Sequence, residues 1–151
     1  MISNMKKCYL DSNVLINFKN VQSPFHQETK KLLTKLTNAS WKLYISSLTL
    51  DEFLYQLRRI FLYQKQKNIF QKLSLALKSI LDLPRLTLIN PSVSKKKHLE
   101  IVEYMKVYNL RPRDAYHFLT MKENKIKHLF TFDKDFKKVI KAGEIVSLTE
   151  I

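Results

Sequence analysis

The chain has 151 residues, 45% of them hydrophobic, so it is long and apolar enough for a globular domain and is not disordered. Its 27 Lys and Arg residues outnumber 13 Asp and Glu residues, and the formal net charge of +14 favours a polyanionic partner such as nucleic acid. The single cysteine excludes an internal disulfide, and no apolar run suits a membrane span or a secretory signal, so we expect a cytoplasmic protein that does not contact a membrane.

Short apolar runs alternate with amphipathic segments along the chain. Runs such as KCYL and WKLYI predict buried strands, and apolar residues at helical spacing predict the helices between them. The pair Ser23-Pro24 predicts an N-cap followed by proline at the first helical position. The predicted elements are a strand at 7–10, helices at 13–20 and 24–37, a strand at 41–45, helices at 49–61 and 65–83, a strand at 86–89, helices from 92 or 94 to 108 and at 112–124, a strand at 127–132, a helix at 135–141 and a strand at 145–148.

This alternation predicts an α/β fold with three α/β/α layers, in which helices cover both faces of a mainly parallel sheet of about four to five strands. We expect residues 1–151 to form a single domain, because one glycine and four prolines leave little room for a flexible linker. The segment at about 57–83 is long and rich in Lys and Gln, and it predicts a helical hairpin that extends from this domain.

Four acidic residues are placed where strands end or helices begin. Asp11 and Asp133 each follow a predicted strand, whereas Glu52 and Asp114 each lie in the first turn of a predicted helix. Ligands of an open parallel sheet bind beyond the carboxyl ends of its strands, and the helices that leave those strands begin at the same edge. We therefore expect the four carboxylates to converge there.

Convergent carboxylates repel one another, and divalent cations that prefer oxygen ligands, such as Mg²⁺ or Mn²⁺, remove this conflict. On a basic protein, one or two such ions suggest hydrolysis of phosphodiester bonds. Lys and Arg side chains would bind the nucleic-acid backbone, and the metal would lower the pKa of a bound water.

Each acid also has a purely structural interpretation. Asp11 and Asp133 could cap the helices that follow them, and Asp114 could stabilise a helix dipole. Thr49 and Glu52 have the spacing of a capping box. These roles explain each acid alone, but they do not explain why all four are predicted at one edge.

The stretches YLDSNVLI, SSLTLDEFL, RPRDAYHFL and FTFDKDF, in this order, resemble the PIN-domain ribonuclease family, and the length of the chain resembles the VapC-type toxins of toxin–antitoxin pairs. The resemblance implies a Rossmann-like fold and a Mg²⁺- or Mn²⁺-dependent endoribonuclease. It also implies a homodimer and a small antitoxin as a partner. An RNA-processing nuclease outside any toxin system remains an alternative.

The resemblance assigns roles to particular residues of this chain. The four acids of the family pattern fall on positions that would hold the metal: Asp11, Glu52, Asp114 and Asp133. Asn13 and Thr131 match positions of orienting polar residues and are included among the catalytic candidates. Asp135 matches an occasional extra ligand, and Asp51 is the rival of Glu52.

Two other features have alternative interpretations. His117 lies one turn after Asp114 and could approach the site, although a surface or hydrogen-bonded core histidine is more common. Arg113 could position a phosphate or simply be solvated.

Two other protein classes are alternatives to this interpretation. A haloacid-dehalogenase-type phosphatase also begins with an acid after a strand, but Asn13 stands where that family needs a second Asp. A metal-free basic module that binds RNA or protein is the alternative from another class.

Overall fold

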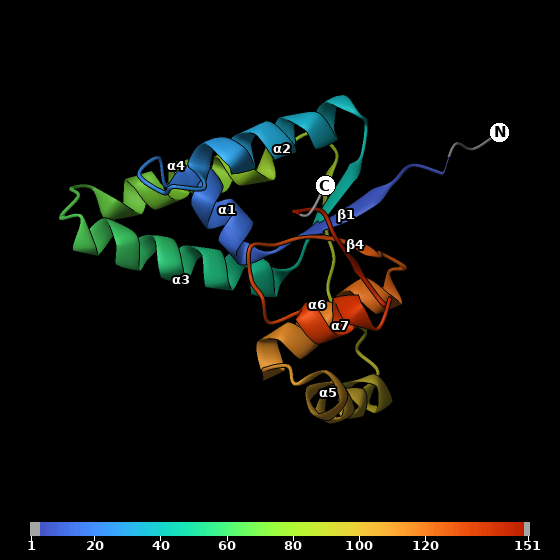
Figure 1. Cartoon of the computed structure of the whole chain (residues 1–151). Coiled ribbons are helices and arrows are strands. Elements are labelled where there is room, and N and C mark those ends of the chain that lie inside the picture. The colour runs from blue at the N-terminus through green and yellow to red at the C-terminus, as the bar shows by residue number, and fades with distance from the viewer. Residues whose placement is uncertain (1–3, 150–151) are drawn as a thin grey trace.

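The computed structural model describes residues 4–149, in which five parallel strands form one sheet in the order β3-β2-β1-β4-β5 (Figure 1). The strands are β1 (Lys7–Leu10), β2 (Lys42–Ile45), β3 (Leu86–Leu88), β4 (His128–Phe130) and β5 (Val146–Ser147). The helices are α1 (Ser12–Lys19), α2 (His26–Asn38), α3 (Ser47–Tyr63), α4 (Ile69–Leu81), α5 (Lys95–Tyr108), α6 (Pro112–Glu123) and α7 (Lys137–Lys141). Among these helices, none is long and apolar enough to cross a membrane.

Helices cover both faces of the sheet, as successive residues of β1 show. Cys8 and Leu10 are fully buried in a core that includes residues of α1 to α4. Tyr9, between them, is buried in a second core with residues of α5, α6 and α7. Because successive side chains of a strand point to opposite faces, the two cores confirm the predicted three-layer α/β/α arrangement.

Helices α3 and α4 lie side by side and extend together beyond the sheet (Figure 1). Leu57 of α3 and Leu73 of α4 are buried in the same core. The connection between the helices has left-handed backbone at Lys65 (φ 53°) and Asn68 (φ 54°). Helix α4 therefore begins at Ile69 and not at the predicted residue 65.

Two further predicted helix starts are wrong in detail. Helix α2 begins after Phe25, which makes no side-chain cap bond, and the Ser23 hydroxyl accepts from Phe25 N (3.1 Å) in the preceding turn. Helix α3 begins before Thr49, because Ser46 is its N-cap and forms a capping box with Thr49. Glu52 therefore lies in the second turn of α3, not in the first turn as predicted, and has no part in the capping box.

Candidate active site

The carboxyl ends of β1 and β4 lie side by side and lead to the first and last of the predicted acids. Asp11 follows β1, and its backbone N–H donates to the carbonyl of Phe130, the last residue of β4 (3.0 Å). Asp11 is also the N-cap of α1, where its Oδ1 atom accepts from Ser12 N (2.7 Å). The carboxylate thus caps α1 with one oxygen and has a second oxygen for other contacts.

The second oxygen of Asp11 is held by Thr131 and Asn13. The Thr131 hydroxyl donates to Asp11 Oδ2 (2.7 Å), and Asn13 Nδ2 lies 3.3 Å from the same oxygen. The Thr131 hydroxyl in turn accepts from Asn13 Nδ2 (3.2 Å) and from Asp133 N (2.9 Å). Since a hydroxyl has one proton and two lone pairs, all three bonds can form together. They tie the orientation of Asp11 to the loop that carries Asp133.

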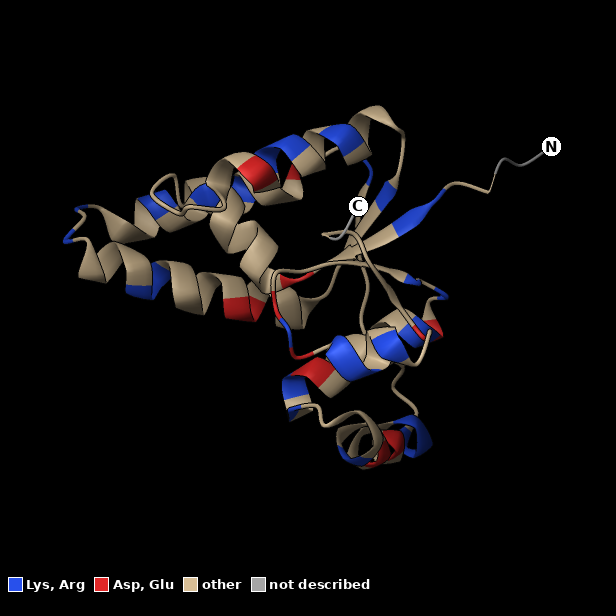
Figure 2. Cartoon of the chain, viewed as in Figure 1, with Lys and Arg blue, Asp and Glu red and all other residues tan. Residues whose placement is uncertain are grey.

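Three further carboxylates gather at this edge. Asp114 from the first turn of α6, with Asp133 and Asp135 from the loop after β4, can each place one oxygen within 4.8 Å of the others. Together with Glu52 they line a hollow of about 480 Å³, where acidic segments of several elements meet (Figure 2). Asp51 is exposed on α3 and lines a different hollow, between α3 and α4.

Two arginines at the start of α6 stand beside these carboxylates. Arg111 and Arg113 are exposed and line the same hollow. Arg111 Nη2 lies 3.7 Å from Asp135 Oδ2, a long contact at a mostly exposed side chain. The entrance to the acidic hollow therefore carries positive charge that can attract an anionic substrate.

Burial and mutual repulsion disfavour the charged form of these acids. Burial, followed by the charges of Asp133, Asp11 and Asp135, raises the pKa of Asp114 to about 6. Burial also raises the pKa of Asp11, although the charge of His117 and the Thr131 hydrogen bond oppose this effect. A divalent cation would relieve the repulsion, and the donors present are carboxylate oxygens, which Mg²⁺ and Mn²⁺ prefer. The residues therefore fit such an ion.

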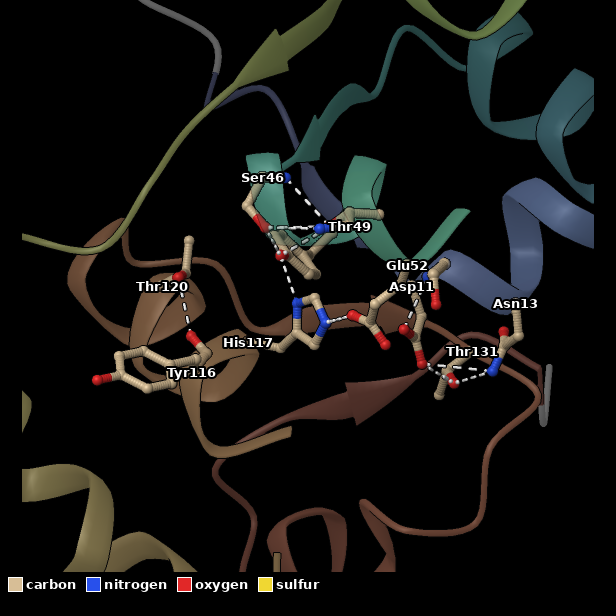
Figure 3. Close-up of polar contacts among 11 residues, drawn as sticks. Asp11, Asn13, Ser46, Thr49, Glu52, Tyr116, His117, Thr120 and Thr131 are labelled. Atoms are coloured by element: carbon tan, nitrogen blue, oxygen red, sulfur yellow. Dashed lines mark hydrogen bonds and ion pairs between the residues drawn. The ribbon is translucent and has the colours of Figure 1, made fainter. Parts of the chain in front are cut away.

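The Glu52 carboxylate is hydrogen-bonded to a buried histidine, His117, whose role the sequence did not reveal (Figure 3). His117 Nε2 lies 2.5 Å from Glu52 Oε1, and His117 Nδ1 lies 2.7 Å from the Tyr9 hydroxyl. Burial alone lowers the pKa of His117, but the Glu52 hydrogen bond and the surrounding carboxylates outweigh it and raise the pKa. The available signal was the spacing of Asp114 and His117, which places both on one face of α6.

Comparisons with known proteins relate most of the chain to one family. A family model described as the PIN domain matches residues 8–142, a range that includes all of the acids above. A search of the curated proteins gave no match.

Solved structures share the fold over nearly their whole length. The chain matches Mycobacterium tuberculosis VapC20, described as a sarcin–ricin loop cleaving toxin, with a TM-score of 0.65 and 17% identity over 92% of this chain and 96% of that chain. FitAcB from Neisseria gonorrhoeae gives a TM-score of 0.63 and 21% identity, covering 93% of this chain and 95% of that chain. VapBC2 from Rickettsia felis, bound to a DNA fragment from its promoter, gives a TM-score of 0.61 and 20% identity, covering 93% of this chain and 96% of that chain.

Proposed function

Because the chain belongs to the PIN-domain family, we propose that it is a cytoplasmic Mg²⁺- or Mn²⁺-dependent endoribonuclease that hydrolyses RNA phosphodiester bonds. The observation that carries the proposal is the group formed by Asp114, Asp133 and Asp135, with Glu52 on the wall of the same hollow. In a chain with 27 basic and 13 acidic residues, such a gathering of acids is costly unless a cation binds there.

The proposed ion is held by carboxylates from four elements: Asp11, Glu52, Asp114 and Asp133, with Asp135 as an additional donor. When bound, it would lower the pKa of a water molecule and stabilise the leaving oxygen of the phosphodiester. This chemistry requires carboxylates that are ordered before the substrate arrives.

The polar residues around Asp11 supply that order. Thr131 and Asn13 each contact the same oxygen of Asp11, so its carboxylate keeps one orientation in the folded chain. Arg113 is exposed beside the hollow and can contact a phosphate of the RNA backbone. Thr131 and Asn13 thus orient a ligand, whereas Arg113 positions the substrate.

We further propose that the protein is the toxin of a toxin–antitoxin pair and binds a small antitoxin. The proposal is supported by solved structures of similar fold, which include VapBC2 and a toxin–antitoxin complex from Klebsiella pneumoniae. We also propose a homodimer, for which α5 offers an apolar surface, since Leu99 and Val102 are 78% and 70% exposed. Expression of the chain alone should slow the growth of a bacterial host, and co-expression of a small antitoxin should restore it; unchanged growth would contradict the toxin role.

The nuclease activity is tested with purified protein and RNA, including ribosomal RNA because VapC20 is described as cleaving the sarcin–ricin loop. The wild type should cleave RNA with Mg²⁺ or Mn²⁺ and lose this activity in excess EDTA. Asp11→Asn keeps the size of the side chain but removes the charge, and we expect at least roughly a 100-fold loss of rate, typical of a lost electrostatic group in an active site.

Asp51→Asn is the matched control, because Asp51 is an exposed acid on α3 that faces a different hollow. We expect this variant to cleave RNA like the wild type. Cleavage that continues in excess EDTA would contradict the proposed dependence on a metal ion. RNA that is bound but never cleaved would instead support the basic binding module.

A further inference from the structure

We infer that His117 is a positioning residue that holds the Glu52 carboxylate at the candidate metal site through a buried chain of hydrogen bonds. The inference rests on the proposed function, because Glu52 is a proposed ligand of the ion. The side chain of His117 is 1% exposed, whereas that of Glu52 is 17% exposed. The histidine therefore contacts Glu52 from the protein interior while Glu52 reaches the hollow.

The chain of hydrogen bonds continues from His117 to the start of α3 (Figure 3). The Tyr9 hydroxyl lies 2.7 Å from His117 Nδ1, 2.8 Å from Ser46 Oγ and 3.1 Å from Thr49 Oγ1. Ser46 and Thr49 form the capping box of α3 and hold each other through backbone N–H groups. Because Glu52 itself lies on α3, these hydrogen bonds form a closed network that connects β1, α6 and the first turns of α3.

The bond between His117 and Glu52 has the same direction in either charge state of the histidine. An ionised Glu52 only accepts hydrogen bonds, so Nε2 must carry the proton. In a neutral ring, Nδ1 then accepts from the Tyr9 hydroxyl. In a protonated ring, Nδ1 donates to Tyr9, which can donate to Ser46 or Thr49. The inference therefore does not depend on the titration of His117.

Both ring nitrogens of His117 are occupied by these contacts, which excludes this histidine as a direct metal ligand in this arrangement. Its effect is on the relative positions of the proposed metal ligands. His117 and Asp114 are three residues apart on α6, so they lie on the same helix face. The bond to Glu52 thus sets the position of one proposed ligand on α3 relative to another on α6.

Glu52 needs such support, because a glutamate side chain loses rotamer freedom when it is fixed, and a neighbouring negative charge, that of Asp11, repels it. Hydrogen bonds to a ligating carboxylate fix its orientation before the ion binds, and loss of such a partner typically weakens metal binding or activity about 10- to 100-fold. His117 supplies this bond at a site that water hardly reaches.

The test compares His117→Gln with His117→Asn. The amide nitrogen of glutamine reaches about as far as Nε2 and can still donate to Glu52, whereas that of asparagine reaches only about as far as Nδ1. Calorimetric titration with Mn²⁺ should give near wild-type affinity for the Gln variant and at least about tenfold weaker binding for the Asn variant. RNA cleavage at limiting Mn²⁺ should follow the same order.

His98→Asn is the matched control. His98 is also bonded through both nitrogens, to Tyr116 Oη (3.0 Å) and Ser92 O (2.8 Å), but it does not contact the acidic hollow. This variant should keep the Mn²⁺ affinity of the wild type, whatever its stability. Equal Mn²⁺ affinity in the Asn and Gln variants of His117, whether strong or weak, would overturn the inference.

A spectroscopic measurement keeps this inference separate from the proposed function. In the wild type, the Nε2 proton of His117 should give a downfield NMR signal that shifts or vanishes in Glu52→Ala, whether or not an ion is present. A wild type that binds no Mn²⁺ would contradict the proposed function. A bound ion with no difference among the His117 variants would contradict only the role of His117.

Discussion

At the residue scale, Asp114 is destabilising in the ion-free protein, because burial and neighbouring charges raise its pKa from 3.8 to about 6. A carboxyl with a higher pKa in the folded state binds its proton more tightly when folded. The stabilisation that the bound proton gives to the folded state is therefore complete below pH 3.8, and it is lost as the pH rises through about 6 and the carboxylate becomes charged. At pH 7.5 we expect Asp114→Asn to raise the free energy of unfolding by about 1 kcal/mol, a value reduced for solvent screening at a partly exposed group.

Urea denaturation in EDTA measures this effect. The variant should be more stable than the wild type at pH 7.5 and no more stable at pH 4, where Asp114 is largely protonated when folded. Added Mn²⁺ should reverse the order at pH 7.5, because an ion that binds only the folded wild type stabilises it. Equal stability of the two proteins at pH 7.5 would show that Asp114 is not under electrostatic stress.

The acids and the histidine differ in how far the sequence could predict them. Asp11 and Asp133 follow strands and Asp114 opens a helix, so the topology of a parallel sheet places them at one edge. The contact between His117 and Glu52 joins residues 65 positions apart, and that between His117 and Tyr9 joins residues 108 apart. Such contacts depend on how α3, α6 and β1 pack together, which local spacing does not specify.

At the element scale, apolar periodicity predicted the helices and strands of residues 4–149 in their correct order, but it misplaced several ends. Apolar spacing reports the buried face of an element and carries little information on where its backbone stops. The start of α4 is an example, since the Lys and Gln residues before it suit a helix equally well. The chain reverses there through left-handed backbone at Lys65 and Asn68, neither of which is a glycine.

This turn gives a prediction about stability. Lys65 has φ 53°, and left-handed backbone is costly for a residue with a Cβ atom. We expect Lys65→Gly to raise the free energy of unfolding of the chain by up to about 1 kcal/mol, as a net result of relieved strain and greater freedom of the unfolded chain. Thermal denaturation compares this variant with the wild type.

Lys67→Gly in the same connection is the control. Lys67 is also exposed, but it is not among the residues with positive φ. A glycine at position 67 relieves no backbone strain and only increases the conformational freedom of the unfolded chain, so this variant should be slightly less stable than the wild type. A lower melting temperature for Lys65→Gly as well would show that the lysine side chain contributes more than the backbone strain costs.

At the scale of the whole molecule, an acidic hollow lies within a strongly basic protein. Lys and Arg residues are spread over most elements, whereas acidic segments meet at the edge of the sheet (Figure 2). A net charge of +14 attracts RNA at long range without sequence preference. The carboxylates alone repel phosphates, so cations beside the hollow must hold the strand close to them. Arg111 and Arg113 occupy such positions, because both are exposed and line the hollow.

This arrangement predicts that cations beside the hollow contribute more to RNA binding than cations elsewhere. Affinity for a fluorescent single-stranded RNA is measured in EDTA, which prevents the proposed cleavage, over a range of salt concentrations. Each lost phosphate contact reduces the slope of log affinity against log salt by about 0.7, so the Arg111→Ala/Arg113→Ala double variant should lose about 1.4. The Lys30→Ala/Lys31→Ala variant removes the same charge from exposed positions on α2 and should keep the wild-type slope. Equal losses of slope in both double variants would mean that RNA binds through the diffuse charge of the whole surface, and that the acidic hollow does not determine where the strand lies.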